Sequence, residues 1–310
     1  MVRYFIKRVL TLIPVLLAVS FLVFWLMSMT GDPARTIAGD TVTEAQLEQM
    51  RETMGLNEPI TVRFGRWLSN ALLHGDFGKS LYGDDCWKEF ALRFPHTLKL
   101  AITSILLTIA IAVPFGIVAA VKQNSWVDTL LSSTAILGLS MPTFWMGMLL
   151  IVLFSVKLNW LPSGGDNGTI LSLLMPMFCS AVNNVALVTR MTRSSMVDQI
   201  RADYLRTARA KGVSEKKVLW GHALKNALIP IITTIGTQLS FLIGGTTVIE
   251  TVFSWPGVGS YTVACIRSND FMPATCNVVL ISTMTAVILI VVDMLYAFVD
   301  PRIKARYKRG

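Results

Sequence analysis

Charged side chains are scarce in this chain of 310 residues. Asp, Glu, Lys and Arg supply 15% of it, against about 25% in an average soluble domain, whereas hydrophobic residues supply 53%. This shortage excludes an ordinary soluble domain and indicates a membrane protein. The formal net charge is +9, but the bases lie in loops beside apolar runs and form no single patch with base-reading side chains, so no nucleic-acid partner is expected.

Signatures of catalysis and metal binding are also missing. The sequence has no Gly-x-x-x-x-Gly-Lys-Ser/Thr phosphate loop, no His-Glu-x-x-His and no Gly-x-Ser-x-Gly. Its three histidines are scattered and its four cysteines lack zinc spacing, so we expect no catalytic residue, metal site or cofactor in this chain. Cys179 falls in an apolar run, whereas a disulfide between two of Cys86, Cys265 and Cys276 stays open. Any ATP and Mg that power the protein must bind another chain.

Long apolar runs are the dominant feature of the sequence. A membrane-spanning helix needs about 20 such residues, and the runs of this length are 9–29, 97–121, 129–156, 170–189, 227–249 and 275–299. The first run is too long for the roughly 7–15 apolar residues of a signal peptide, and no Ala-x-Ala site follows it, so we expect it to be retained. The sequence therefore predicts an all-α membrane protein with six transmembrane helices.

Basic residues are distributed unevenly among the segments between these runs. Arg3, Lys7 and Arg8 precede the first run, and bases are in excess in 190–226. Because short loops rich in Lys and Arg stay in the cytoplasm, both termini and segment 190–226 are expected inside. We divide the chain accordingly into a tail and first helix at 1–29, an extracytoplasmic cap at 30–95, a core of five helices at 96–300 that contains loop 190–226, and a basic cytoplasmic tail at 301–310.

Polar residues within the expected spans are candidate functional residues, because they are costly in hydrocarbon. Asn183 and Asn184 fit interhelical hydrogen bonds as well as they fit a substrate path. Asp293 fits pairing with bases at the inner end of the last span better than it fits a proton relay. Glu250, at the outer end of the fifth span, is expected to line the mouth of a pathway or to meet water. The Gly244–Gly245 pair on that span predicts close helix packing.

The segment from Tyr204 to Asn226 is strongly polar although apolar runs flank it. It carries six bases and one acid, and Ala208, Ala210 and Gly212 place small side chains among the bases. Inner loops are often basic, and Ala, Arg and Lys favour helix in any case, but these tendencies do not account for the order of residues here. A polar helix–turn–helix between membrane spans predicts a docking site for a soluble partner.

Several longer segments resemble a known family, the permease subunits of type I ABC importers in the dipeptide, oligopeptide and nickel group. The resemblance covers nearly the whole chain and rests on Arg3–Arg8, Gly31–Pro33, Leu56–Pro59, Gly75–Ser80, Ser140–Trp145, Arg190–Met196, Asp203–Gly212, Ile249–Gly259 and Asp300–Arg302. It implies the six-helix permease fold of that family, with the N-terminal cap outside. It also implies a location in the inner membrane of a bacterial or archaeal cell.

The family's coupling motif reads Glu-Ala-Ala, three residues, Gly, nine residues, Ile-x-Leu-Pro. Aligned on Gly212, it matches Ala208, Gly212 and Leu224 and departs at its Glu, Ile and Pro, and a proline comes later at Pro230. The departures resemble those usual in the peptide branch. The resemblance implies a short coupling helix that docks in a groove of a cytoplasmic ATPase and uses Tyr204, Arg206, Thr207, Ala208, Arg209, Ala210, Lys211 and Gly212.

The resemblance also implies partners and a class of solute. A second homologous permease, two ATPase subunits that hold ATP and Mg, an extracytoplasmic substrate-binding protein and membrane lipid are the expected partners. The solute is expected to be a peptide, glutathione-like molecules included. The short outer loop at 157–169 keeps nickel or a metal–chelator complex as an alternative. A different class, an ion-coupled secondary transporter using Asp293, usually shows internal repeats and charges at mid-span, and neither is evident here.

Overall fold

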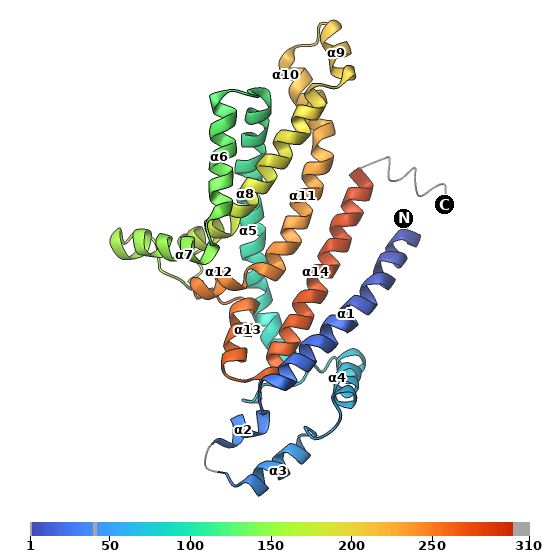
Figure 1. The fold of residues 1–310 in the computed structure, drawn as a ribbon, viewed down its shortest axis with the longest axis vertical. Helices are drawn as coiled ribbons and strands as arrows, with labels where there is room; N and C mark the ends of the chain where they lie inside the picture. Colours follow the sequence, from blue (N-terminus) through green and yellow to red (C-terminus); the bar gives the residue numbers. More distant parts are fainter. Residues whose placement is uncertain (1, 40–41, 300–310) are drawn as a thin grey trace.

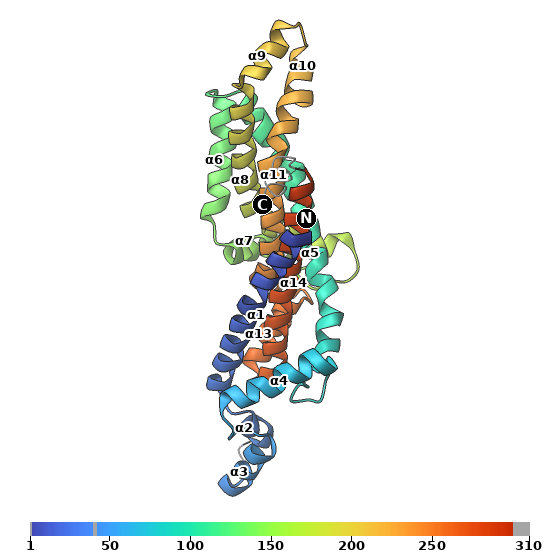
Figure 2. The same cartoon turned by 90° about the vertical axis from the view of Figure 1, so that its right-hand side faces the viewer.

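The protein is an elongated bundle of long helices. The computed structural model describes residues 2–39 and 42–299. Within these residues the only β-type pairing is one isolated bridge between Lys79 and Asp85, so the all-α prediction is confirmed. Figures 1 and 2 show short helices gathered at the two ends, α2–α4 at one and α9–α10 at the other.

Five helices in the described residues are long and apolar enough to cross a membrane. They are α1 (Val2–Thr30), α5 (Cys86–Val121), α8 (Ile170–Ile200), α11 (Leu224–Gly245) and α14 (Phe271–Val299). Four of them contain a whole expected span, whereas α11 ends at Gly245 and not at residue 249. α5 and α8 extend well beyond their apolar segments. α5 begins at Cys86 and not at residue 97, because the Asp85 side chain accepts a hydrogen bond from the Lys88 backbone and caps the helix there.

The sixth expected span, 129–156, is not one straight helix. α6 (Trp126–Ser140) is followed by α7 (Thr143–Leu150) and the π-helix η2 (Ile151–Lys157), and the chain bends by 97° between them. The break has a local cause. Proline disfavours helical geometry in the residue before it, and Met141, before Pro142, is extended at φ −88° and ψ 126°. The prediction of six spans therefore holds only when this bent pair is counted as one.

The glycine pair on α11 does not pack as expected. A Cβ on Gly245 would meet nothing within 4 Å, and one on Gly244 would make only an ordinary contact with Thr285. The pair instead ends α11, after which α12 (Thr247–Val252) and α13 (Val258–Arg267) lead back to α14. Close approach occurs elsewhere. A Cβ on Gly236 would overlap Val292 of α14, and one on Gly116 of α5 would overlap Thr192 of α8.

The α2–α4 end is folded and tied to the bundle. α2 spans Pro33–Ala38, α3 spans Glu44–Thr53 and α4 spans Ile60–His74. Thr43 and Gln46 form a capping box at the start of α3. Trp67 of α4 is buried against Phe24 of α1, and its indole donates to the Phe77 carbonyl at 3.1 Å. The aromatic residues of the cap segment thus build a fixed structure against α1.

An ion pair between the buried Asp128 and the partly exposed Arg193 joins the start of α6 to α8. The Arg193 guanidinium donates to both carboxylate oxygens of Asp128 at 2.6 Å, and the Asp128 side chain is 6% exposed. Asp128 also accepts from the Asn124 backbone at 3.0 Å. Arg193, read from the sequence as one more base of the inner loop, therefore holds two helices together.

Replacing Asp128 by alanine is expected to destabilise the fold by about 3 kcal/mol, because the Arg193 charge then loses its buried partner. The midpoint of thermal unfolding in detergent measures this loss. Arg201→Ala is the matched control, since Arg201 is exposed and bonds only to Gln123, and it should change the stability by less than about 0.5 kcal/mol. Equal midpoints for both variants would show that the pair contributes nothing.

Candidate functional site

The polar loop between α8 and α11 forms the α9 end of the molecule (Figure 1). α8 continues to Ile200, so the loop is shorter than the expected 190–226. It consists of α9 (Asp203–Ala210), α10 (Glu215–Lys217) and the π-helix η3 (Val218–Ala223). The predicted short helix is therefore present, and its docking role stays a prediction.

One apolar residue fixes α9 to the bundle. Leu205 is fully buried in a cluster with Ile117 of α5, Met196 of α8 and Ile231 of α11. Ala208 packs against the same cluster, so this small residue faces inward and is not part of an outer surface. The cluster therefore packs α9 against three of the long helices.

The outer side of α9 is polar and open. Arg206, Thr207, Ala210 and Lys211 are exposed, and Gly212 follows with φ +78°. A Cβ at Gly212 would meet nothing within 4 Å, so glycine is needed there for its left-handed backbone and leaves free space outside. The predicted small-sided docking surface is thus reduced to Ala210 and Gly212.

Polar contacts hold the loop in this shape. The Tyr204 hydroxyl donates to Gln199 of α8 at 2.9 Å and accepts from Asn226 of α11 at 2.9 Å. Arg209 donates two hydrogen bonds to Glu215, and this contact lowers the pKa of the Glu215 carboxyl. Tyr204 and Arg209 therefore organise the loop, whereas Arg206 and Lys211 remain available to a partner.

Trp220 is a surface feature that the sequence reasoning missed. Its side chain is 55% exposed on η3, beside the bases of α10. Exposed aromatic residues are enriched at protein interfaces. The sequence offered one signal of this surface feature, namely a tryptophan within a basic loop.

The two asparagines of α8 have different environments. Asn184 is buried, donates to the Ser180 carbonyl at 2.9 Å and accepts from Gln238 of α11 at 2.5 Å. It therefore makes the interhelical bond that was one of its two interpretations. The Asn183 Oδ1 atom is buried without a hydrogen-bond partner among the described residues. Its role in a substrate path remains untested.

Glu250 lies in the core, and the expectation that it meets water is wrong. Its side chain is fully buried and accepts hydrogen bonds from Thr97 at 2.7 Å, Thr246 at 3.0 Å and the Ser260 backbone at 2.9 Å. A Cβ on Gly257 would overlap the carboxylate. The Phe253–Gly259 segment is therefore wrapped around this one acidic group, which joins α5, α11 and α13.

Asp293 lies on α14, but its side chain falls outside the described residues, as do the bases at 301–310. Neither of its two interpretations is tested. Among the described residues, no group of three or more His, Cys, Asp or Glu side chains is placed to hold a metal ion.

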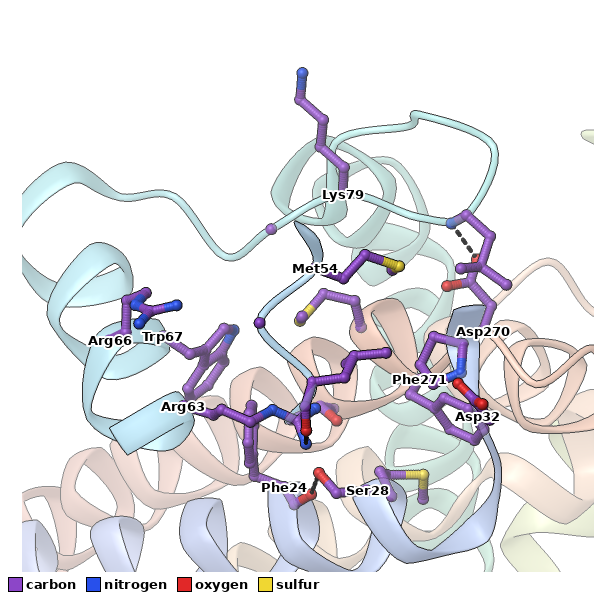
Figure 3. Close-up of a pocket in the computed structure, with 18 of the residues that line it drawn as sticks. Phe24, Ser28, Asp32, Met54, Arg63, Arg66, Trp67, Lys79, Asp270 and Phe271 are labelled. Atoms are coloured by element: carbon purple, nitrogen blue, oxygen red, sulfur yellow. Dashed lines mark hydrogen bonds between the residues drawn. The ribbon is translucent and has the colours of Figure 1, made fainter. Parts of the chain in front are cut away.

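A cavity of about 480 Å³ lies at the opposite end, between the cap helices and the bundle (Figure 3). Its walls combine apolar and charged residues from α1, α3, α4 and the turn before α14, among them Phe24, Met54, Arg63, Trp67, Asp270 and Phe271. No motif marked it in the sequence, because its lining residues come from distant parts of the chain.

Comparison with known proteins agrees with this architecture. The family described as "Binding-protein-dependent transport system inner membrane component" matches residues 112–305, and the N-terminal family of the same system matches residues 1–101. The chain is 43% identical over 310 residues to the "Glutathione transport system permease protein GsiC" of Pectobacterium atrosepticum, covering 99% of this chain and 100% of that protein. The protein of the same name from Escherichia coli K12 is 43% identical over 311 residues, with the same coverage.

A solved structure shares the fold. The MetNI methionine ABC transporter, in an inward-facing conformation, aligns with a TM-score of 0.58 and 17% identity over 68% of this chain and 96% of that chain. The bundle and its α9 loop define a multi-pass membrane permease of the type I ABC importer class. The chain belongs to the family of binding-protein-dependent transport system inner membrane components.

Proposed function

We propose that this chain is one of two permeases of an ATP-driven importer for short peptides, with glutathione as the leading solute. The observation that carries the proposal is the match over the whole length to permeases named for glutathione transport, together with an α9 loop whose outer side is open. The family argues against an ion-coupled secondary transporter, because it is defined by transport that depends on a binding protein.

The proposed orientation follows the distribution of bases. The α9 end lies in the cytoplasm, with both chain termini on that side, and the α2–α4 cap lies outside. In Figure 1 the start of α1 lies toward the α9 end, which agrees with this arrangement.

Four partner chains complete the proposed assembly. A second permease closes the translocation path, two ATPase subunits bind ATP and Mg, and a binding protein delivers the solute to the cap. Arg206 and Ala210 of α9, Lys211 just after it and Trp220 of η3 are the proposed contacts with one ATPase. Because α9 is fixed to three long helices through Leu205, closure of the ATPases would move those helices and open the path in alternation.

Uptake by the reconstituted importer tests this function. Proteoliposomes that hold the ATPases and ATP inside, with the binding protein and radiolabelled glutathione added outside, should accumulate glutathione, and competition by short peptides should reduce the uptake. If the proteoliposomes took up nickel or a nickel–chelator complex but no glutathione, the solute would be the metal and not a peptide. Uptake without any nucleotide would contradict the proposal.

A further inference from the structure

The cavity of Figure 3 contains a buried acidic group with an unused acceptor. Asp270 is 3% exposed, and its Oδ2 atom accepts from the Leu81 backbone at 3.1 Å. Its Oδ1 atom is buried and has no hydrogen-bond partner among the described residues. A buried acceptor left unpaired costs about 1–3 kcal/mol. This atom therefore favours a ligand that brings a donor.

The charge state of Asp270 also favours a ligand that brings a donor. Burial raises the pKa of this carboxyl, and nearby Asp84 raises it further, against the opposing effect of the Leu81 hydrogen bond. A positively charged donor would stabilise the ionised form that burial disfavours.

A basic group that forms no ion pair with any described residue lies on the other side of the cavity. In Figure 3, Arg63 extends from α4 toward the middle, while Asp270 lies at the opposite wall. Burial lowers the pKa of Arg63 against the opposing effect of the Glu58 charge. The Arg63 side chain donates to the Leu56 carbonyl at 3.5 Å and lies 5.9 Å from the centre of the Phe24 ring. Its neighbours differ, because Arg51 is paired with Asp32 and Arg66 with Glu58.

We infer that this cavity binds a short zwitterionic peptide, with its ammonium group on Asp270 and a carboxylate on Arg63. Met54, Trp67 and Phe271 also line the cavity and would contact the apolar parts of the ligand. The volume lies within the roughly 300–1,000 Å³ typical of small-molecule sites. The inference rests on the proposed function and deepens it by placing a solute site in the cap, before the membrane path.

A phospholipid with an ammonium headgroup carries the same two charges. The walls favour the peptide, because most of the lining residues, including those of α3, α4 and the loops around Gly78 and Asp270, lie outside the apolar spans. The spans contribute Phe24, Met27 and Ser28 from α1 and Phe271, Met272 and Thr275 from α14. Binding of such a lipid in place of a peptide is therefore one outcome that the test distinguishes.

The test is calorimetric titration of the full chain in phosphatidylcholine nanodiscs, without binding protein or ATPases, with glutathione as the probe. Wild-type protein should bind glutathione about tenfold more tightly than N-acetylglutathione, which lacks the ammonium group. Asp270→Asn should bind both equally weakly. Arg63→Gln should lose the preference for glutathione over its glycine ethyl ester. Lys79→Gln is the matched control, because Lys79 lines the cavity but points away from it in Figure 3.

Equal affinity of wild-type protein for glutathione and N-acetylglutathione would overturn the site, and this result needs no variant to fold. Retention of phosphatidylethanolamine by wild-type protein but not by Asp270→Asn in native mass spectrometry, with no peptide binding, would also overturn it. The cavity site and the importer function can be rejected separately. ATP-driven uptake by Asp270→Asn at the wild-type rate would reject the site but not the importer function.

Discussion

Replacing Gly212 by tryptophan is expected to abolish ATP-driven uptake without reducing the amount of chain in the membrane. Gly212 is exposed at the α9 end, and a Cβ there meets no other atom within 4 Å. The added ring is therefore expected to project outward into the space proposed for the ATPase. Co-purification of the ATPase and solute-stimulated ATP hydrolysis measure the loss.

Gly212→Ala is the control for the backbone. It places a Cβ at φ +78° and costs about 1 kcal/mol of local strain, as tryptophan also does, but it adds almost no bulk. Alanine should keep most of the uptake. Equal losses for the two variants would assign the effect to the left-handed turn, and wild-type uptake by Gly212→Trp would refute the docking role of α9.

Glu250→Ala is expected to lower the stability of the folded chain by at least about 3 kcal/mol. The change leaves the Thr97 hydroxyl, the Thr246 hydroxyl and the Ser260 amide without their common acceptor in a fully buried site. The midpoint of thermal unfolding in detergent measures the effect. Because α5, α11 and α13 meet at this group, uptake should fall with the amount of folded protein.

Two further variants make the Glu250 result specific. Glu250→Gln keeps the volume but replaces one acceptor oxygen by a donor, so it should fall between wild type and alanine. Glu52→Ala removes an exposed acid from α3 and should change the stability by less than about 0.5 kcal/mol. A Glu250→Ala protein as stable as Glu52→Ala would show that the buried carboxylate is not structural.

The spans and the short helix α9 were predictable because they depend on local properties. Apolar runs of sufficient length predicted the long helices, and the Thr43–Gln46 spacing is typical of a capping box, which is present. The run 129–156 was read as one span, whereas Pro142 within it ends α6 and produces the 97° bend. Its effect depends on whether neighbouring helices satisfy the freed backbone groups, which the sequence does not state.

The buried polar groups were not predictable, since each depends on a partner far along the chain. In the sequence, Glu250 is an acidic residue at the end of an apolar run. Its hydrogen bond from Thr97 of α5 is visible only in the structure. Asp270 and Arg63 share a cavity only because the cap folds back against α14. Hydrophobic periodicity locates helices, but it does not determine which helix ends meet.

The central claim is that this permease is powered through its α9 loop by separate ATPase subunits. Mass spectrometry of the complex purified through this chain in mild detergent tests it most directly. We predict a second permease and two ATPase subunits, with cross-links from Lys211 to an ATPase. A chain that is purified alone or as a homodimer, and that still takes up solute without ATP, would contradict the account and make Asp293 the next site to test.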